Sequence, residues 1–262
     1  MRGPQALCVI ALLAHGAAEA DDEPNYWQYA ITSDGKQNAT TLWWDGGEEA
    51  FEGKPARFVQ EVTVVDKVRT HRRTYFDVTD DGVVQLGTRG DIEMEKAVTT
   101  SETVVSPPLV VIPTRFAAGT KRVVKATTQI KTSGSDSEMV IEGTVEIAGV
   151  QKAVVPAGAF DCTVVRTMTT STFSIADQRM TIKTNTDACY DVAVGLVQLT
   201  TTSDSEVRPK QGKPTITHQA SSMALAKYRV IKPPWQMVAV TTPRTPPATP
   251  ATATPPVVAP AP

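Results

Sequence analysis

The chain has 262 residues, of which 26 are basic and 28 are acidic, so its formal net charge is −2. A near-neutral balance does not favour binding to nucleic acid or to an anionic membrane surface. Hydrophobic residues make up 41% of the chain, and the roughly 210 residues between its two ends suffice for one domain with a sizeable core.

The first twenty residues have the anatomy of an export signal. Arg2 is the charged start, Ala6–Ala14 is an apolar run, and Ala18–Ala20 supplies the small residues of a cleavage site. We expect residues 1–20 to be removed, so that the mature chain begins at Asp21 and is periplasmic or extracellular. No apolar segment reaches the roughly 20 residues that span a bilayer, so we expect no membrane-spanning segment.

The mature chain opens with aromatic and β-branched residues, which are typical of strands. We expect a first strand over Tyr26–Ile31 and a second over Thr40–Trp44, which ends at a tight turn formed by Asp45–Gly47. The aromatic rings have two interpretations, because they would either fill the core or line a groove for a sugar or a lipid. The candidate groove residues are Tyr26, Trp27, Trp43 and Trp44.

Two antiparallel strands with one buried face are predicted next. Apolar and polar residues alternate over 57–68, and the pattern repeats over 72–79. We interpret the basic residues in this region as a solvated turn between the strands, because the run is too short for a nucleic-acid footprint. The run consists of Lys67, Arg69, His71, Arg72 and Arg73.

Turn-forming residues divide the middle of the chain. Asp80-Asp81-Gly82 predicts a hairpin, and Pro107–Pro113 predicts an extended or edge segment. We expect Asp91–Ala97 to make a helical turn. Gly134–Ser137 lacks the second glycine of a nucleophile elbow, and we interpret it as a hairpin loop before the alternating strand Met139–Ile147.

The stretch Val154–Leu199 holds both cysteines of the mature chain. Cys162 falls on the apolar face of a predicted strand, and an even pair in an exported chain favours a disulfide between Cys162 and Cys189. Residues 173–186 are expected to return as a further strand or as a bent pair of strands, with 176–178 as a candidate break. Because two strand spacings exceed disulfide reach, the crosslink requires neighbouring strands, a bent return segment, or Cys189 at a strand entrance.

The last predicted strand covers Thr215–Val230, and a helix over Ser221–Lys227 is the main alternative. Residues 233–262 are rich in Pro, Thr and Ala, which predicts a disordered tail. The sequence therefore predicts one all-β antiparallel domain over 21–232, built as a curved sheet, a half-open barrel or a sandwich.

Catalytic and metal-binding patterns are weak in this sequence. His71 and His218 lie far apart, and no paired Cys or His spacing of the zinc type occurs. Asp161 and Asp191 are candidates for the carboxylate pair of a hydrolase, although Asp161 is predicted to face solvent. We therefore predict no catalytic residue, no metal ligand and no cofactor.

Val155–Cys162 reads V-P-A-G-A-F-D-C and is followed by Tyr190 and by Val194–Val197. This pattern resembles a family of exported bacterial β proteins that includes YmcC-like and TapB-like lipoproteins. Here Ala193 replaces the first glycine of the family's G-V-G-L-V segment, and Cys189 stands where an aromatic residue usually precedes the tyrosine.

The resemblance implies a curved antiparallel sheet or half-open barrel in the bacterial envelope. It implies structural roles for Pro156, Gly158 and Gly195 at turns and for Phe160 in the core, and it brings no catalytic residues. We therefore expect a non-enzymatic exported protein that binds an apolar ligand or lipid, a glycan, or an envelope protein. A carboxylate-dependent hydrolase acting in the concavity of the sheet is the alternative.

Overall fold

The computed structural model describes residues 24–231, apart from 66–67, 95–96, 114–117 and 176–177. The predicted signal at 1–20 and the predicted tail at 233–262 lie outside these residues. In the described part of the chain, every regular element is a strand. The strands are β1 (Tyr26–Ser33), β2 (Lys36–Phe51), β3 (Lys54–Val65), β4 (Val68–Thr79), β5 (Gly82–Met94), β6 (Ala97–Pro113), β7 (Lys121–Thr132), β8 (Ser135–Val155), β9 (Gly158–Ile175), β10 (Gln178–Asp191), β11 (Gly195–Pro209) and β12 (Thr215–Arg229).

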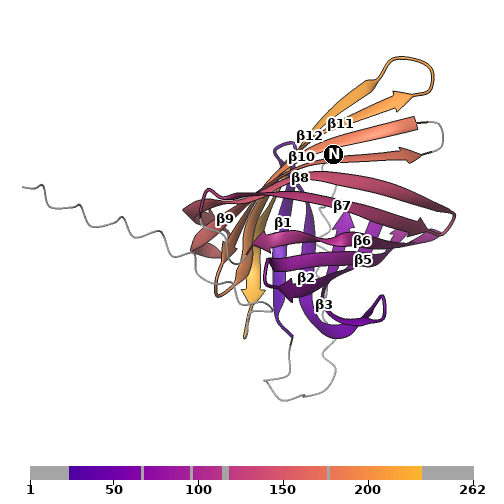
Figure 1. The fold of residues 1–262 in the computed structure, drawn as a ribbon. Coiled ribbons are helices and arrows are strands. Elements are labelled where there is room, and N and C mark those ends of the chain that lie inside the picture. The colour runs from indigo at the N-terminus through magenta and orange to yellow at the C-terminus, as the bar shows by residue number, and fades with distance from the viewer. Residues whose placement is uncertain (1–23, 66–67, 95–96, 114–117, 176–177, 232–262) are drawn as a thin grey trace, which may run out of the picture.

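These strands form one antiparallel sheet that closes into a barrel (Figure 1). Each strand pairs with the strand before it in the chain, and β1 also pairs with β12. The predicted antiparallel all-β architecture is confirmed. Because every strand follows its spatial neighbour, the fold needs only hairpin connections, for which Asp80-Asp81 and Ser133-Gly134 provide turns at the predicted places.

The turn expected at Asp45–Gly47 is wrong, because β2 runs through these residues to Phe51. The pairing of β2 with β3 shifts here, so Gly46 is the extra residue of a β-bulge. A Cβ at Gly46 would overlap the ring of Phe58, which explains why glycine occupies the bulge. The Asp45 carboxylate accepts the Gly47 N–H at 3.1 Å and holds the bulge in place.

The last predicted strand is confirmed, because Ser221–Lys227 lies within β12 and the helical alternative does not occur. Two other local predictions are wrong. Asp91–Met94 continues β5 instead of forming a helical turn. Arg69–Arg73 belongs to β4 instead of a turn. In each case cross-strand pairing decides the conformation, because a strand with partners on both sides overrides a weak local preference.

The largest cluster of buried side chains lies where β1 meets β10, β11 and β12. Trp27 and Tyr29 are 4% and 1% exposed. The Trp27 indole donates a hydrogen bond to the carbonyl of Val194 at 2.7 Å, and the Tyr29 hydroxyl donates to the carbonyl of Leu196 at 3.0 Å. The first strand is thereby fixed to the turn between β10 and β11.

The same cluster is completed by the hairpin of β8 and β9. At its turn, the N–H of Ala157 donates to the carbonyl of Leu225 in β12 at 3.0 Å. Four consecutive residues of β9, Cys162–Val165, are buried, so both faces of the strand are covered there. Cys162 and Cys189 lie on the neighbouring strands β9 and β10 and form a disulfide with a Cα–Cα distance of 5.4 Å.

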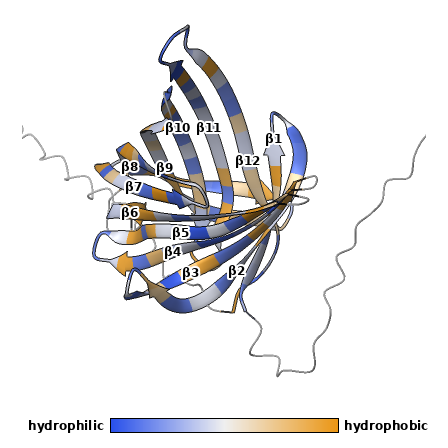
Figure 2. Cartoon of the chain, turned by 90° about the vertical axis from the view of Figure 1, so that its right-hand side faces the viewer, coloured by the Kyte–Doolittle hydropathy of each residue, from blue (hydrophilic) through white to orange (hydrophobic). Residues whose placement is uncertain are grey.

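Beyond this cluster, the hairpins of β9 with β10 and of β11 with β12 extend past the rest of the barrel (Figure 1). The extended parts carry mostly polar residues in Figure 2, with a few hydrophobic ones between them, and Thr215–Ala220 of β12 is exposed throughout. Two smaller clusters fill the barrel elsewhere: one centres on Val145 and Val165, the other on Phe51, Phe58 and Tyr75.

Loss of the disulfide should lower the free energy of unfolding by about 3 kcal/mol, because the crosslink joins residues 27 positions apart in the unfolded chain. Urea denaturation of the mature protein with and without reductant measures this loss. A Cys162→Ala/Cys189→Ala variant should unfold like the reduced protein and ignore the reductant. Reduction should add the mass of two hydrogens, and an unchanged intact mass would contradict the crosslink.

Two tryptophans provide a matched test of the buried hydrogen bond. Among the described residues, the buried Nε1 of Trp43 has no hydrogen-bond partner, whereas that of Trp27 has one. Trp27→Phe should therefore destabilise the fold by about 1–3 kcal/mol more than Trp43→Phe, since only the first leaves a buried carbonyl unpaired. Urea denaturation of both variants checks the difference, and equal losses would refute it.

Candidate functional site

A row of long polar side chains crosses five neighbouring strands, β3 to β7. In the sheet register Gln60 is paired with Arg73, Arg73 with Arg89, Arg89 with Glu102, and Glu102 with Lys131. Residues that are paired in this way place their side chains on the same face of a sheet, about 5 Å apart. We call these five residues the charged row.

The charged row lines a pocket of about 790 Å³, together with His71, Asp91 and Thr100 from the next row of the register. Its other lining groups include the backbone or side chains of Arg72, Gly90 and Ser101. The lining is dominated by charged and hydroxyl groups, so the pocket suits a ligand that can form many hydrogen bonds.

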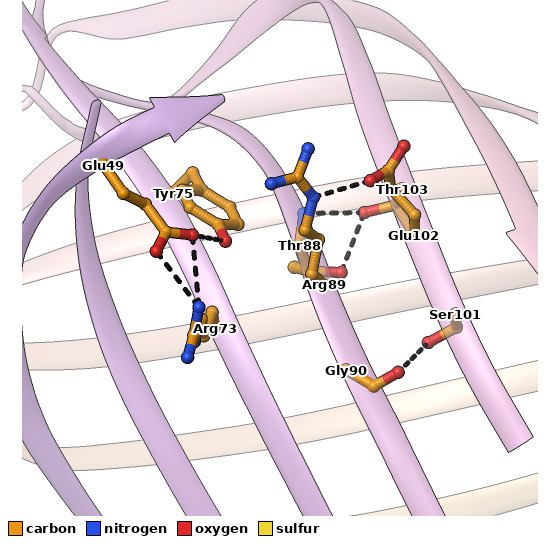
Figure 3. A network of polar contacts seen from close by, with 9 residues as sticks. All are labelled: Glu49, Arg73, Tyr75, Thr88, Arg89, Gly90, Ser101, Glu102 and Thr103. Atoms are coloured by element: carbon orange, nitrogen blue, oxygen red, sulfur yellow. Dashed lines mark hydrogen bonds and ion pairs between the residues drawn. The ribbon is translucent and has the colours of Figure 1, made fainter. Parts of the chain in front are cut away.

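Aromatic rings and carboxylates hold the two central arginines (Figure 3). Arg89 Nε donates to a Glu102 oxygen at 2.6 Å, and the guanidinium lies 5.1 Å from the centre of the Phe51 ring and 5.5 Å from that of Tyr75. Arg73 donates to Glu49 at 3.0 Å. Such cation–π and ion-pair contacts fix the orientation of a long side chain.

The aromatic support depends on a glycine in β5. The rings of Phe51 and Tyr75 stack with their centres 4.3 Å apart. Gly87 is paired with Tyr75, and a Cβ there would lie 2.6 Å from the Phe51 ring and would also collide with the carbonyl of Thr103. The absence of a side chain at Gly87 therefore allows Phe51 to reach the position from which it supports Arg89.

Tyr75 joins the aromatic support to the charged groups. Its residue surface is 0% exposed, and its hydroxyl is hydrogen-bonded to the carboxylate of Glu49. Burial raises the pKa of Tyr75, and the hydrogen bond and negative charge of Glu49 raise it further, whereas Arg89 and Arg73 act in the opposite direction. Both guanidinium groups thus lie close enough to influence one phenol.

The four candidate groove aromatics lie elsewhere, on β1 and β2. Trp27 is buried in the largest cluster, and Trp43 packs against that cluster with its ring 5.0 Å from Tyr29. Tyr26 and Trp44 are half-buried and paired with each other across the strands. None of the four lines the pocket of the charged row.

The residues of the V-P-A-G-A-F segment lie around the β8–β9 turn. Pro156 stands in the turn itself, and Gly158 opens β9 with φ +137°. Phe160 is half-buried, with its ring 5.9 Å from that of Tyr228. Gly195 opens β11 with φ +93°, a backbone angle that favours glycine.

The two candidate catalytic carboxylates have different surroundings. Asp191 accepts the backbone N–H groups of Ala193 and Val194 at 2.8 and 3.0 Å, so it caps the turn before β11. Asp161 is exposed on β9. The described residues contain no group of three or more His, Cys, Asp or Glu side chains placed to hold a metal ion.

The residues that line the pocket are only partly predictable from the sequence. The basic run in β4 was apparent, and His71, Arg72 and Arg73 from it line the pocket. Arg89, Glu102 and Lys131 gave no signal, because each is an isolated charge in its own segment. Only the register brings them into one row.

No family model matches the chain, and no curated protein matches its sequence. Among solved structures, it is similar to a candidate lipoprotein from Parabacteroides distasonis, with 14% identity and a TM-score of 0.41, over 79% of this chain and 95% of that one. It is also similar to a candidate exported protein with a YmcC-like fold from Bacteroides fragilis, with 12% identity and a TM-score of 0.40, over 78% and 95% of the two chains. No helix in the described residues is long and apolar enough to cross a membrane.

Tyr75 should make the fold sensitive to alkali. Because its pKa is raised above the ordinary 10.0, its contribution to stability is complete below about pH 10 and is lost as the pH rises through the folded-state pKa. Tyr75→Phe should therefore flatten the decline of the free energy of unfolding above pH 10. Urea denaturation across pH 8 to 11 measures this, with Tyr228→Phe, whose residue is 40% exposed, as the control. Identical slopes for wild type and Tyr75→Phe would contradict the assignment.

Proposed function

We propose that this protein is an exported, non-catalytic binding protein whose ligand is a glycan held in the pocket of the charged row. The observation that supports this proposal is the chemistry of the pocket, which is lined by guanidinium, carboxylate, ammonium and hydroxyl groups. A glycan presents many hydroxyl groups and can satisfy such donors and acceptors. An apolar ligand or lipid would leave them unpaired, at a cost in free energy.

The geometry also favours binding over turnover. The carboxylate of Glu102 accepts a hydrogen bond from Arg89, and that of Glu49 accepts bonds from Arg73 and Tyr75. These contacts hold the arginines in place, which is a positioning role that a binding site requires. Export follows from the signal expected at residues 1–20.

A substitution that fills the pocket tests the proposal. Thr100 is exposed and lines the pocket, so Thr100→Trp should occupy the ligand's space without disturbing the fold. We expect the mature wild-type protein to bind members of an immobilised glycan panel, and Thr100→Trp to reduce that binding at least about tenfold. Thr217→Trp, at an exposed position of β12 outside the pocket, is the matched control and should bind normally.

Binding that survives Thr100→Trp would place the ligand elsewhere on the molecule and contradict the proposal. Release of shortened products from the panel by the wild-type protein would contradict its non-catalytic part and favour the hydrolase alternative.

A further inference from the structure

The centre of the charged row places two like charges opposite each other on neighbouring strands. Arg73 and Arg89 are paired in the register of β4 and β5. Like charges placed directly opposite each other on neighbouring strands destabilise a sheet. The fold nevertheless keeps them together and supports them with rings from Phe51, Phe58 and Tyr75.

The carboxylates in contact with these arginines engage only part of each guanidinium. Arg89 donates to Glu102 through Nε, and Arg73 donates to Glu49 through Nη1. A guanidinium has five N–H donors. Both guanidinium groups also lie within reach of the Tyr75 hydroxyl. Figure 3 shows the terminal nitrogens of Arg89 directed away from Glu102.

Both side chains remain open to an incoming ligand. The side chain of Arg73 is 45% exposed and that of Arg89 is 39% exposed, and both line the pocket. Lys131 at the end of the row is exposed as well. Lys131 is paired in turn with Asp136 of β8, so with Glu49, Glu102 and Asp136 counted the three cations face three carboxylates. Arg73 and Arg89 stand next to each other within this row.

The other acidic groups of the pocket lie away from the two arginines. Asp91 is paired with His71, and Glu93 is paired with Arg69, in the rows nearer the end of the sheet. Each of these carboxylates therefore faces a basic residue in its own row. The space between Arg73 and Arg89 is the most basic part of the pocket, and its donors are fixed in direction by the rings below.

From this arrangement we propose that Arg73 and Arg89 form a subsite for an acidic group of the glycan, either the carboxylate of a uronic acid or a sulfate ester. Two guanidinium groups side by side can each present paired N–H donors to an oxyanion, which is the geometry that arginine offers and lysine lacks. Lys131 adds positive charge without fixing direction. The inference rests on the proposed glycan-binding function and specifies which class of glycan the pocket selects.

Charge-matched ligands test the subsite. The mature protein is exposed to an immobilised panel of uronic-acid oligosaccharides and to the same panel after methyl esterification, which converts each carboxylate to a neutral ester. A second pair consists of sulfated oligosaccharides and their desulfated counterparts. We expect the charged member of at least one pair to bind at least about tenfold more tightly than its neutral counterpart. Added salt should reduce this difference. The pair that shows the effect identifies the oxyanion.

The protein variants locate the effect. Arg73→Gln and Arg89→Gln should each remove most of the preference for the charged ligand, whereas Arg179→Gln, at an exposed position of β10 outside the pocket, should preserve it. Because Arg89 packs on two rings, Arg89→Lys serves as a second variant that keeps the charge and much of the stem. It should fold and still lose most of the preference, since the fork of donors is gone.

The outcomes separate the two proposals. If charged and neutral glycans bind equally well, and Thr100→Trp abolishes this binding, the acidic subsite is overturned and the glycan-binding function remains. The subsite is also overturned if the preference for charged glycans persists in all three variants, Arg73→Gln, Arg89→Gln and Arg89→Lys. If the wild-type protein binds no glycan, or binds only in a way that Thr100→Trp leaves unchanged, both proposals are overturned.

Discussion

Closure of the barrel depends on how the first strand is held. β1 is only eight residues long and must pair with β2 on one side and β12 on the other. Its two buried aromatic side chains donate hydrogen bonds to carbonyls beside the β10–β11 turn, which lies far away in the sequence. A buried indole or phenol without such a partner would cost free energy, so these bonds favour the closed arrangement over an open sheet.

The interior of the closed sheet contains two clusters of buried side chains that have different roles. Around Cys162 and Cys189, the hairpin of β8 and β9, the disulfide and the first strand produce an apolar cluster. On β2 to β4, a smaller cluster around the rings of Phe51, Phe58 and Tyr75 lies under the long charged side chains of Arg73 and Arg89. The first region stabilises the fold, and the second provides a rigid base on which polar groups are displayed.

Placing a candidate site on paired strands has a physical advantage. Side chains at the same register position are held at a spacing set by backbone hydrogen bonds, and here aromatic rings also limit their rotation. Ordering Arg73 and Arg89 on ligand binding therefore costs less conformational entropy than ordering arginines on a mobile loop. The supporting carboxylates of Glu49 and Glu102 offset the repulsion between the two cations in the absence of a ligand.

The sequence by itself determined the strand class, the hairpins at Asp81 and Gly134, and the inward direction of Cys162, because these follow from alternation and turn chemistry within a few residues. It did not determine the bulge at Gly46, since a glycine before a second glycine is equally typical of a turn. Only the tertiary structure decided the pocket. Arg73, Arg89 and Glu102 come from three strands, and a shift of one residue in any pairing would move a side chain to the opposite face. The register, fixed by bulges and by buried rings such as Phe51 against Gly87, is a property of the assembled sheet and not of any single segment.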